Sequence, residues 1–233
     1  RAFLLWGIGL AISLLLTYIH GLVDPTKWHG FGYALAHLRL LGVLPRLGIC
    51  YGLAAVIALS VKHKLIPWLI AFLFVAYYIV LELGNGYAHD ATNILAVVDN
   101  AVMGANHTYK WDTPDPEGLL STLPALGHVL IGFCVGKVIM SHNDLNDKIE
   151  RLFVIGALLM LTGALLAYLC PVSKKLWTPT FAMVTCGIAC TLLALMSWVI
   201  DKRGHKGRIT EFFHVFGVNP LALYVLSDLL LIP

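Results

Sequence analysis

Seven long stretches of the chain carry no Asp, Glu, Lys or Arg, and short polar segments separate them. The charge-free stretches are residues 2–23, 47–61, 65–81, 118–136, 152–173, 176–200 and 212–227. A bilayer core is crossed by roughly 20 helical residues, and none of these stretches shows the alternation expected of strands. The pattern predicts an all-α, polytopic transmembrane bundle of about seven spans, with the second helix starting near Leu40 and the seventh near Phe212.

The composition agrees with this fold class and excludes others. Hydrophobic residues make up 59% of the 233 residues and charged residues only 12%, against about 25% charged residues in a soluble domain. A soluble enzyme, a disordered chain and a disulfide-stapled secreted domain are therefore excluded. We expect the lipid bilayer to be the main partner, and we expect no nucleic acid to bind.

Both ends of the sequence lie in apolar stretches. Arg1 directly precedes the first stretch, and Pro233 follows the last one without a polar tail. We therefore expect residues 1–233 to be a single domain that is incomplete at its N-terminus and also at its C-terminus.

Basic residues predict how the domain lies in the membrane. If Arg1 is cytoplasmic, the inner loops hold ten Lys and Arg residues and the outer loops six, as the positive-inside rule requires. The outer loops are then 24–39, 82–117 and 170–178, of which only 82–117 is long. Residues 91–103 have apolar positions at helical spacing and predict a short interfacial helix. The short loops suggest a bacterial inner (plasma) membrane.

Small residues in the apolar stretches predict close helix packing. Gly48 and Gly52 form one pair of glycines four residues apart, and Gly132 and Gly136 form another. The five cysteines lie in or at the ends of these stretches without neighbouring His or carboxylate residues, so we expect them to pack as apolar groups and to bind no metal.

Ionisable residues inside the apolar stretches are candidates for function, because burying them in lipid is costly. Arg46, placed one or two turns into the second span, could hold an anion, or its long side chain could snorkel to the surface. His128 could carry protons or be a neutral, hydrogen-bonded group of the bundle. His214 and Asn219 lie near the start of the seventh stretch, and Asp228 could pair with Arg46.

The segment from Thr113 to Thr122 is the most distinctive in the sequence. Pro114 and Pro116 favour an extended chain before the next helix. Asp115 and Glu117 would then lie at a helix N-terminus, where the dipole favours acidic groups. These carboxylates could simply cap the helix, or they could bind a cationic substrate such as an amine-bearing sugar.

Four segments together resemble one known family. DPEGLLSTLPALGHVLIGFCVGK (115–137) resembles the DPEG-containing helix of the heparan-α-glucosaminide N-acetyltransferase-like membrane proteins and their bacterial relatives. LRLLGVLPRLGICY (38–51) is similar to the family's RIPGVLQR segment, with Leu-Leu in place of Arg-Ile and Pro45 in place of Gln. KKLWTPTFAMVTCG (174–187) resembles its KNLWT segment, and GVNPLALY (217–224) its GMN-Y segment.

The resemblance implies a transmembrane acyltransferase that uses acetyl-CoA as co-substrate and an amino sugar as acceptor. The family's catalytic histidine would lie upstream of Arg1, so we expect it to be absent from this chain. Two other functions stay open, an amino-sugar transporter and a non-catalytic membrane component of polysaccharide handling. Family analogy also suggests a homodimer, and it implies no permanently bound cofactor.

The predicted topology places three of these segments at one face of the membrane, which favours a shared outer pocket. In that pocket Asp115 or Glu117 could orient an ammonium group. Arg46 or Lys175 could meet the phosphates of the acyl donor, and Asn219 could donate a hydrogen bond.

Overall fold

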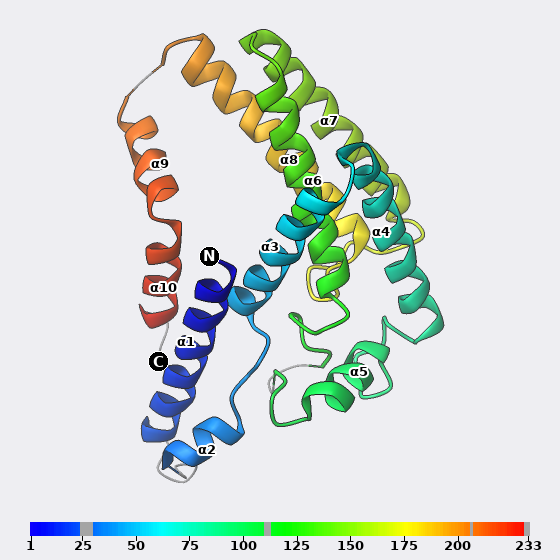
Figure 1. The fold of residues 1–233 in the computed structure, drawn as a ribbon, viewed down its shortest axis with the longest axis vertical. Helices are drawn as coiled ribbons and strands as arrows, with labels where there is room; N and C mark the ends of the chain where they lie inside the picture. The colour runs from blue at the N-terminus through cyan, green and yellow to red at the C-terminus, as the bar shows by residue number, and fades with distance from the viewer. Residues whose placement is uncertain (24–29, 110–112, 206, 231–233) are drawn as a thin grey trace.

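The computed structural model describes residues 1–23, 30–109, 113–205 and 207–230, and this part of the chain is helical without strands. Six helices are long and apolar enough to cross a membrane: α1 (Ala2–Val23), α3 (Val43–Ser60), α4 (Ile66–Leu83), α6 (Thr122–Ser141), α7 (Leu145–Leu166) and α8 (Pro179–Met196). Large apolar side chains point outward from them; Leu59 is 90% exposed and Leu83 85% exposed. The predicted polytopic helical bundle is therefore confirmed (Figure 1).

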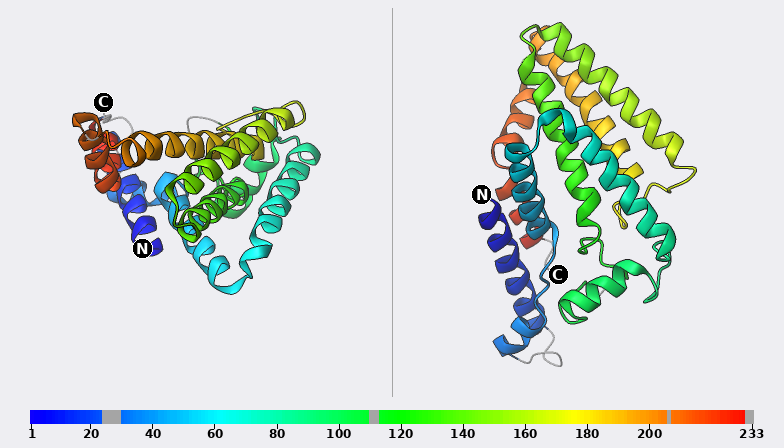
Figure 2. Two further views of the ribbon diagram at one scale, coloured as in Figure 1. Left: turned by 90° about the horizontal axis from the view of Figure 1, so that it is seen from above. Right: turned by 45° about the vertical axis from the view of Figure 1, so that its right-hand side comes forward.

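The seventh predicted span differs from the prediction, because it is broken into two short helices. These are α9 (Arg208–Val218) and α10 (Pro220–Leu230), of 11 residues each. Pro220 has no N–H to donate and disfavours helical backbone in the preceding residue; Asn219 accordingly adopts φ −125° and ψ 47°. At about 1.5 Å per residue, neither helix alone crosses a bilayer core. In Figures 1 and 2, α1 lies between this pair and α3.

The centre of the bundle is formed by α6, which packs against α3, α4 and α8. Leu130 of α6 is fully buried in a core that also contains Phe74 of α4 and Ala182 of α8. The most extensive helix contact joins α7 and α8, where a Cβ built on Gly156 would lie 2.9 Å from the Gly187 carbonyl oxygen. Close packing of this kind is how helices associate in lipid, where burial of apolar surface gives little driving force.

Only one of the two predicted glycine pairs makes a close helix contact in the structure. A Cβ on Gly48 of α3 would lie 2.7 Å from the Ala2 carbonyl oxygen of α1, while one on Gly52 would make an ordinary 3.4 Å contact with Ala2. Gly132 and Gly136 of α6 have no such neighbour within 4 Å among the described residues. The Gly48 position therefore fixes the distance between α1 and α3.

The long loops all gather at one end of the bundle (Figure 1). Here lie α2 (Gly30–Ala36) and α5 (Ile94–Met103), whereas the short 3₁₀ helix η1 (His63–Leu65) and the π-helix η2 (Ser197–Lys202) lie at the opposite end. The short helix predicted over residues 91–103 is thus confirmed, starting at Ile94 after the Asn93 N-cap. Asn93 is fully buried, and its amide donates to the carbonyls of Gly86 and Ala88, so α5 is fixed to the end of α4.

We expect Gly48→Ala to lower the free energy of unfolding by about 1–3 kcal/mol, because its methyl group would press on the backbone of α1. Gly52→Ala, on the same helix face, should leave stability nearly unchanged. Thermal unfolding in detergent micelles would compare the two variants. Equal effects of both substitutions would contradict the packing described for α1 and α3.

Candidate functional site

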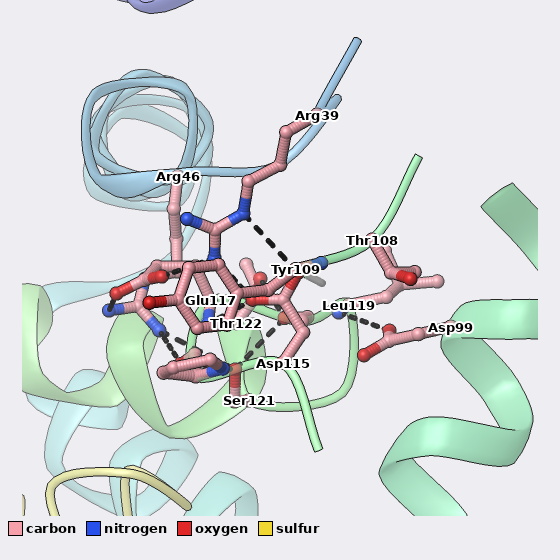
Figure 3. A network of polar contacts seen from close by, with 12 residues as sticks. Arg39, Arg46, Asp99, Thr108, Tyr109, Asp115, Glu117, Leu119, Ser121 and Thr122 are labelled. Atoms are coloured by element: carbon pink, nitrogen blue, oxygen red, sulfur yellow. Dashed lines mark hydrogen bonds and ion pairs between the residues drawn. The ribbon is translucent and has the colours of Figure 1, made fainter. Parts of the chain in front are cut away.

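Four charged side chains meet where α3 and α6 begin, one from the first turn of α3 and three from the segments that precede these two helices (Figure 3). Arg39 precedes α3, and its guanidinium donates hydrogen bonds to the carboxylates of both Asp115 and Glu117. The same guanidinium stacks on the ring of Tyr109 at 4.6 Å. Burial alone would lower the pKa of Arg39, but the hydrogen bonds and charges of Asp115 and Glu117 raise it above its ordinary value.

Arg46 forms the second half of this charge cluster, which we define as Arg39, Arg46, Asp115 and Glu117. It lies in the first turn of α3, since the helix starts at Val43 and not near Leu40, and it is only 5% exposed. Nη1 donates to the Pro116 carbonyl at 2.9 Å, and Nη2 lies 4.0 Å from Glu117 Oε1. The guanidinium also lies over the Trp177 ring at 4.0 Å. Snorkelling is therefore wrong for Arg46, because its charged group is buried among polar and aromatic partners.

The helix-capping hypothesis for Asp115 and Glu117 is also wrong. The helix α6 starts at Thr122 with Ser121 as N-cap, so both carboxylates precede its first turn. Asp115 instead accepts from Arg39 and from the backbone N–H groups of Tyr109 and Glu117, at 2.8 and 2.9 Å. Both acidic groups bind the guanidinium of Arg39, and binding of a cationic substrate by them stays a prediction.

A third loop joins the cluster through the KKLWT segment. Trp177 stacks under Arg46, and Lys175 Nζ donates to the Thr113 carbonyl at 2.8 Å. The structure therefore brings together four of the candidates proposed from the sequence: Arg46, Asp115, Glu117 and Lys175. Their direct role in substrate binding stays a prediction.

The remaining candidates lie elsewhere. His214 and Asn219 are exposed on the α9–α10 pair, on the other side of α1 from the charge cluster. Asp228 is part of α10, but its side chain lies outside the described residues, so its pairing with Arg46 stays untested. His128 is half-buried in α6, with its ring 5.9 Å from that of Trp177, and no hydrogen-bond partner of its Nδ1 lies among the described residues.

Two important residues were not singled out by the sequence analysis, Arg39 and Asp99. Asp99 on α5 is 1% exposed; its Oδ1 accepts from the Leu119 N–H at 2.8 Å, and its Oδ2 has no partner among the described residues. Burial, together with the negative charge of Asp115, raises the pKa of Asp99 to about 6. The hydrogen bond from the Leu119 N–H acts in the opposite direction and lowers this pKa. The sequence did contain a signal for Asp99. It follows Leu95 by four residues and Ala96 by three, which places it on the buried face of this amphipathic helix.

A small cavity lies between α5 and the segment leading to α6. It has about 230 Å³ of empty space, including the part open to solvent, and is lined by Ala96, Asp99, Asn100, Thr108, Tyr109, Thr113 and Asp115. Figure 3 shows Asp99 projecting from α5 towards Leu119, with Thr108 and Tyr109 on the neighbouring segment. The cavity is thus bordered on one side by the charge cluster and on the other by the uncompensated Asp99.

We expect Arg39 and Glu117 to be energetically coupled. Arg39→Met and Glu117→Gln should together cost less than the sum of their single effects, with a coupling of about 0.5–3 kcal/mol. The measurement is a double-mutant cycle on thermal or denaturant unfolding in detergent. Arg39→Met combined with Glu150→Gln, an exposed carboxylate on α7 at the other end of the bundle, should be additive. Additivity in both cycles would contradict the Arg39–Glu117 contact.

We also expect Asp99→Asn to stabilise the protein in a pH-dependent manner. The pKa of Asp99 is higher in the folded than in the unfolded protein, so its protonated form adds to the free energy of unfolding at low pH. That contribution is lost as the pH rises through about 6. The uncharged Asn avoids that loss, on the order of 2 kcal/mol. The unfolding temperature of Asp99→Asn should exceed that of the wild type at pH 7.5 by more than at pH 4. Asp90→Asn should show no such gain, because hydrogen bonds from Thr92 lower the pKa of Asp90.

Comparison with known proteins gives two distant relatives. The chain is 25% identical to heparan-alpha-glucosaminide N-acetyltransferase of Mus musculus over 167 residues, which cover 64% of this chain and 25% of that protein. It is 22% identical to the Homo sapiens protein of the same name over 281 aligned residues, which cover 97% of this chain and 40% of that protein.

No family model matches the chain. The alignments cover between a quarter and two fifths of the length of these two relatives. Identities of this size indicate a distant relation. The chain is therefore an integral-membrane-type helical bundle with distant similarity to the heparan-alpha-glucosaminide N-acetyltransferases.

Proposed function

We propose that this chain is the membrane-embedded part of an N-acetyltransferase that moves an acetyl group from acetyl-CoA to the amine of an amino sugar. The observation that carries the proposal is the meeting of three family-like segments in one polar site. The segments around Arg46, Asp115 and Trp177 lie far apart in the sequence and contact one another at one end of the bundle. The distant relatives bear the name of an enzyme with this activity.

The chemistry of acetyl transfer suggests how this end of the bundle would contribute. The acceptor amine must lose a proton, and the acyl carbonyl needs donors for its developing negative charge. By family resemblance, the histidine that takes the proton lies upstream of Arg1. The residues of this chain would then hold the acceptor and shape the site. The charge cluster would keep the 113–121 segment rigid, since its carboxylates are already bound by Arg39 and Arg46.

We further propose that Arg1 faces the cytoplasm, as the distribution of basic residues predicts. The charge cluster and the cavity would then face the opposite side of the membrane. An acetyl group from cytosolic acetyl-CoA would have to reach an acceptor on that side.

The direct test is acetyl transfer by the full-length protein in proteoliposomes. With radiolabelled acetyl-CoA and glucosamine, we expect labelled N-acetylglucosamine, and we expect Glu117→Gln to lower kcat/KM at least about tenfold by loosening the cluster. Glu150→Gln at the other end of the bundle should retain wild-type activity. Failure to acetylate any amino sugar, or uptake of glucosamine without acetyl-CoA, would contradict the proposal and favour a transporter.

A further inference from the structure

Asp99 is placed in a way that a purely structural residue does not require. It is 1% exposed, yet one of its two carboxylate oxygens lacks a partner among the described residues. An unsatisfied buried polar atom costs free energy of folding, and the cost is greater when the group is charged. Asn at this position could still accept from the Leu119 N–H without carrying the charge. The carboxylate therefore lowers stability without an evident structural return.

The neighbouring acidic groups already have cationic partners in the protein. Asp115 is bound by Arg39 and by two backbone N–H groups, and Glu117 is bound by Arg39 and lies near Arg46. Arg39 and Arg46 are therefore already occupied by these two carboxylates. Of the two described acids that line the cavity, Asp99 and Asp115, Asp99 is the one with a buried carboxylate oxygen that has no hydrogen-bond partner among the described residues.

The cavity next to Asp99 has the size and chemistry of a small polar group. It offers about 30 Å³ to a group of the size of a water molecule, and one water needs roughly 10–15 Å³ of such space. Thr108 and Asn100 add polar side chains to its lining. An ammonium group has three N–H donors and no acceptor, so it suits a small cavity lined by two aspartates and these polar residues.

Gly118 gives Asp99 the space it needs. A Cβ on Gly118 would lie 2.1 Å from Asp99 Oδ2 and 2.9 Å from its carboxyl carbon. Any side chain at position 118 would therefore displace the carboxylate. The glycine that follows Glu117 in the DPEG segment thus leaves room for the carboxylate of Asp99, a residue that lines the cavity.

We infer that the cavity beside Asp99 binds the primary ammonium group of the acceptor, with the buried Asp99 carboxylate as its anionic partner. The inference rests on the proposed function, because it assigns the amine of that reaction to one carboxylate. The charge cluster holds one wall of this site, and Asp99 recognises the substrate. Recognition depends on the positive charge of the amine, so the acetylated product, which has a neutral amide, binds weakly and leaves.

The test is ligand binding to the full-length protein in nanodiscs without acetyl-CoA, followed by ligand-observed NMR or calorimetry. We expect glucosamine to bind and N-acetylglucosamine to bind at least about tenfold more weakly. Asp99→Asn should weaken glucosamine binding about 10- to 100-fold, as expected for loss of a charge-assisted hydrogen bond. Gly118→Ala should weaken it as well, and Asp90→Asn, an exposed acid on the same loop, should not.

The outcomes separate this inference from the proposed function. Asp99→Asn remains folded if its unfolding temperature is at least that of the wild type, so lost binding then reports on the site itself. Unchanged glucosamine binding by folded Asp99→Asn, equal binding of both sugars, or no binding of glucosamine by the wild type would each overturn the inference. Acetylation by Asp99→Asn with an unchanged KM would overturn it while leaving the acetyltransferase proposal intact. Asp99-dependent binding of glucosamine without any acetylation would support the inference and contradict the acetyltransferase proposal.

Discussion

Two guanidinium groups and two carboxylates hold together the loops at one end of this bundle. Arg39 and Arg46 come from the start of α3, and Asp115 and Glu117 from the segment before α6. Buried charges are tolerated only when each has partners, and removing one partner leaves the other uncompensated. The four groups therefore depend on one another. They fix the 113–121 segment, and through the stacking of Trp177 on Arg46 they also fix the loop before α8.

The polar residues at this end of the bundle form two groups. The charge cluster is a rigid frame, and Asp99 with the cavity beside it is the proposed binding site. The charges of the frame pair with one another. Asp99 is attached to the frame through the Leu119 N–H, and its second oxygen has no partner in the part of the chain that the structure describes. Residues that break the rules of stable folding are expected at functional sites, where the surrounding structure holds them in place. A rigid frame next to one unsatisfied carboxylate is such a case.

The sequence predicted the part of the fold that a lipid bilayer requires, namely long apolar helices. Of the seven spans predicted from charge-free stretches, six are long continuous helices, and the apolar spacing of residues 91–103 predicted α5. The break at Pro220 was missed, because counting apolar residues ignores the hydrogen bond that a proline removes. The close contact of Gly156 with Gly187 was missed as well, since which glycines face another helix depends on how the helices are rotated.

The site was predictable only in part. The cost of ionisable groups near lipid pointed to Arg46, the proline-containing segment 113–122 pointed to Asp115 and Glu117, and the family-like segments pointed to Lys175. Their pairing was not predictable, because Arg39 lies 76 residues from Asp115 and 78 from Glu117. Nor did the sequence separate a carboxylate bound by the protein's own arginine from one available to a ligand. That distinction between Asp115 and Asp99 depends on three-dimensional contacts alone.

The most direct measurement is an experimental structure of the full-length protein in a lipid nanodisc, at a resolution that shows side chains. The account predicts that the guanidinium groups of Arg39 and Arg46 both contact the 115–117 segment, at the same end of the bundle as Trp177. A structure in which the start of α3 and the start of α6 lie at opposite ends of the helices, or in which both arginines face water alone, would contradict it.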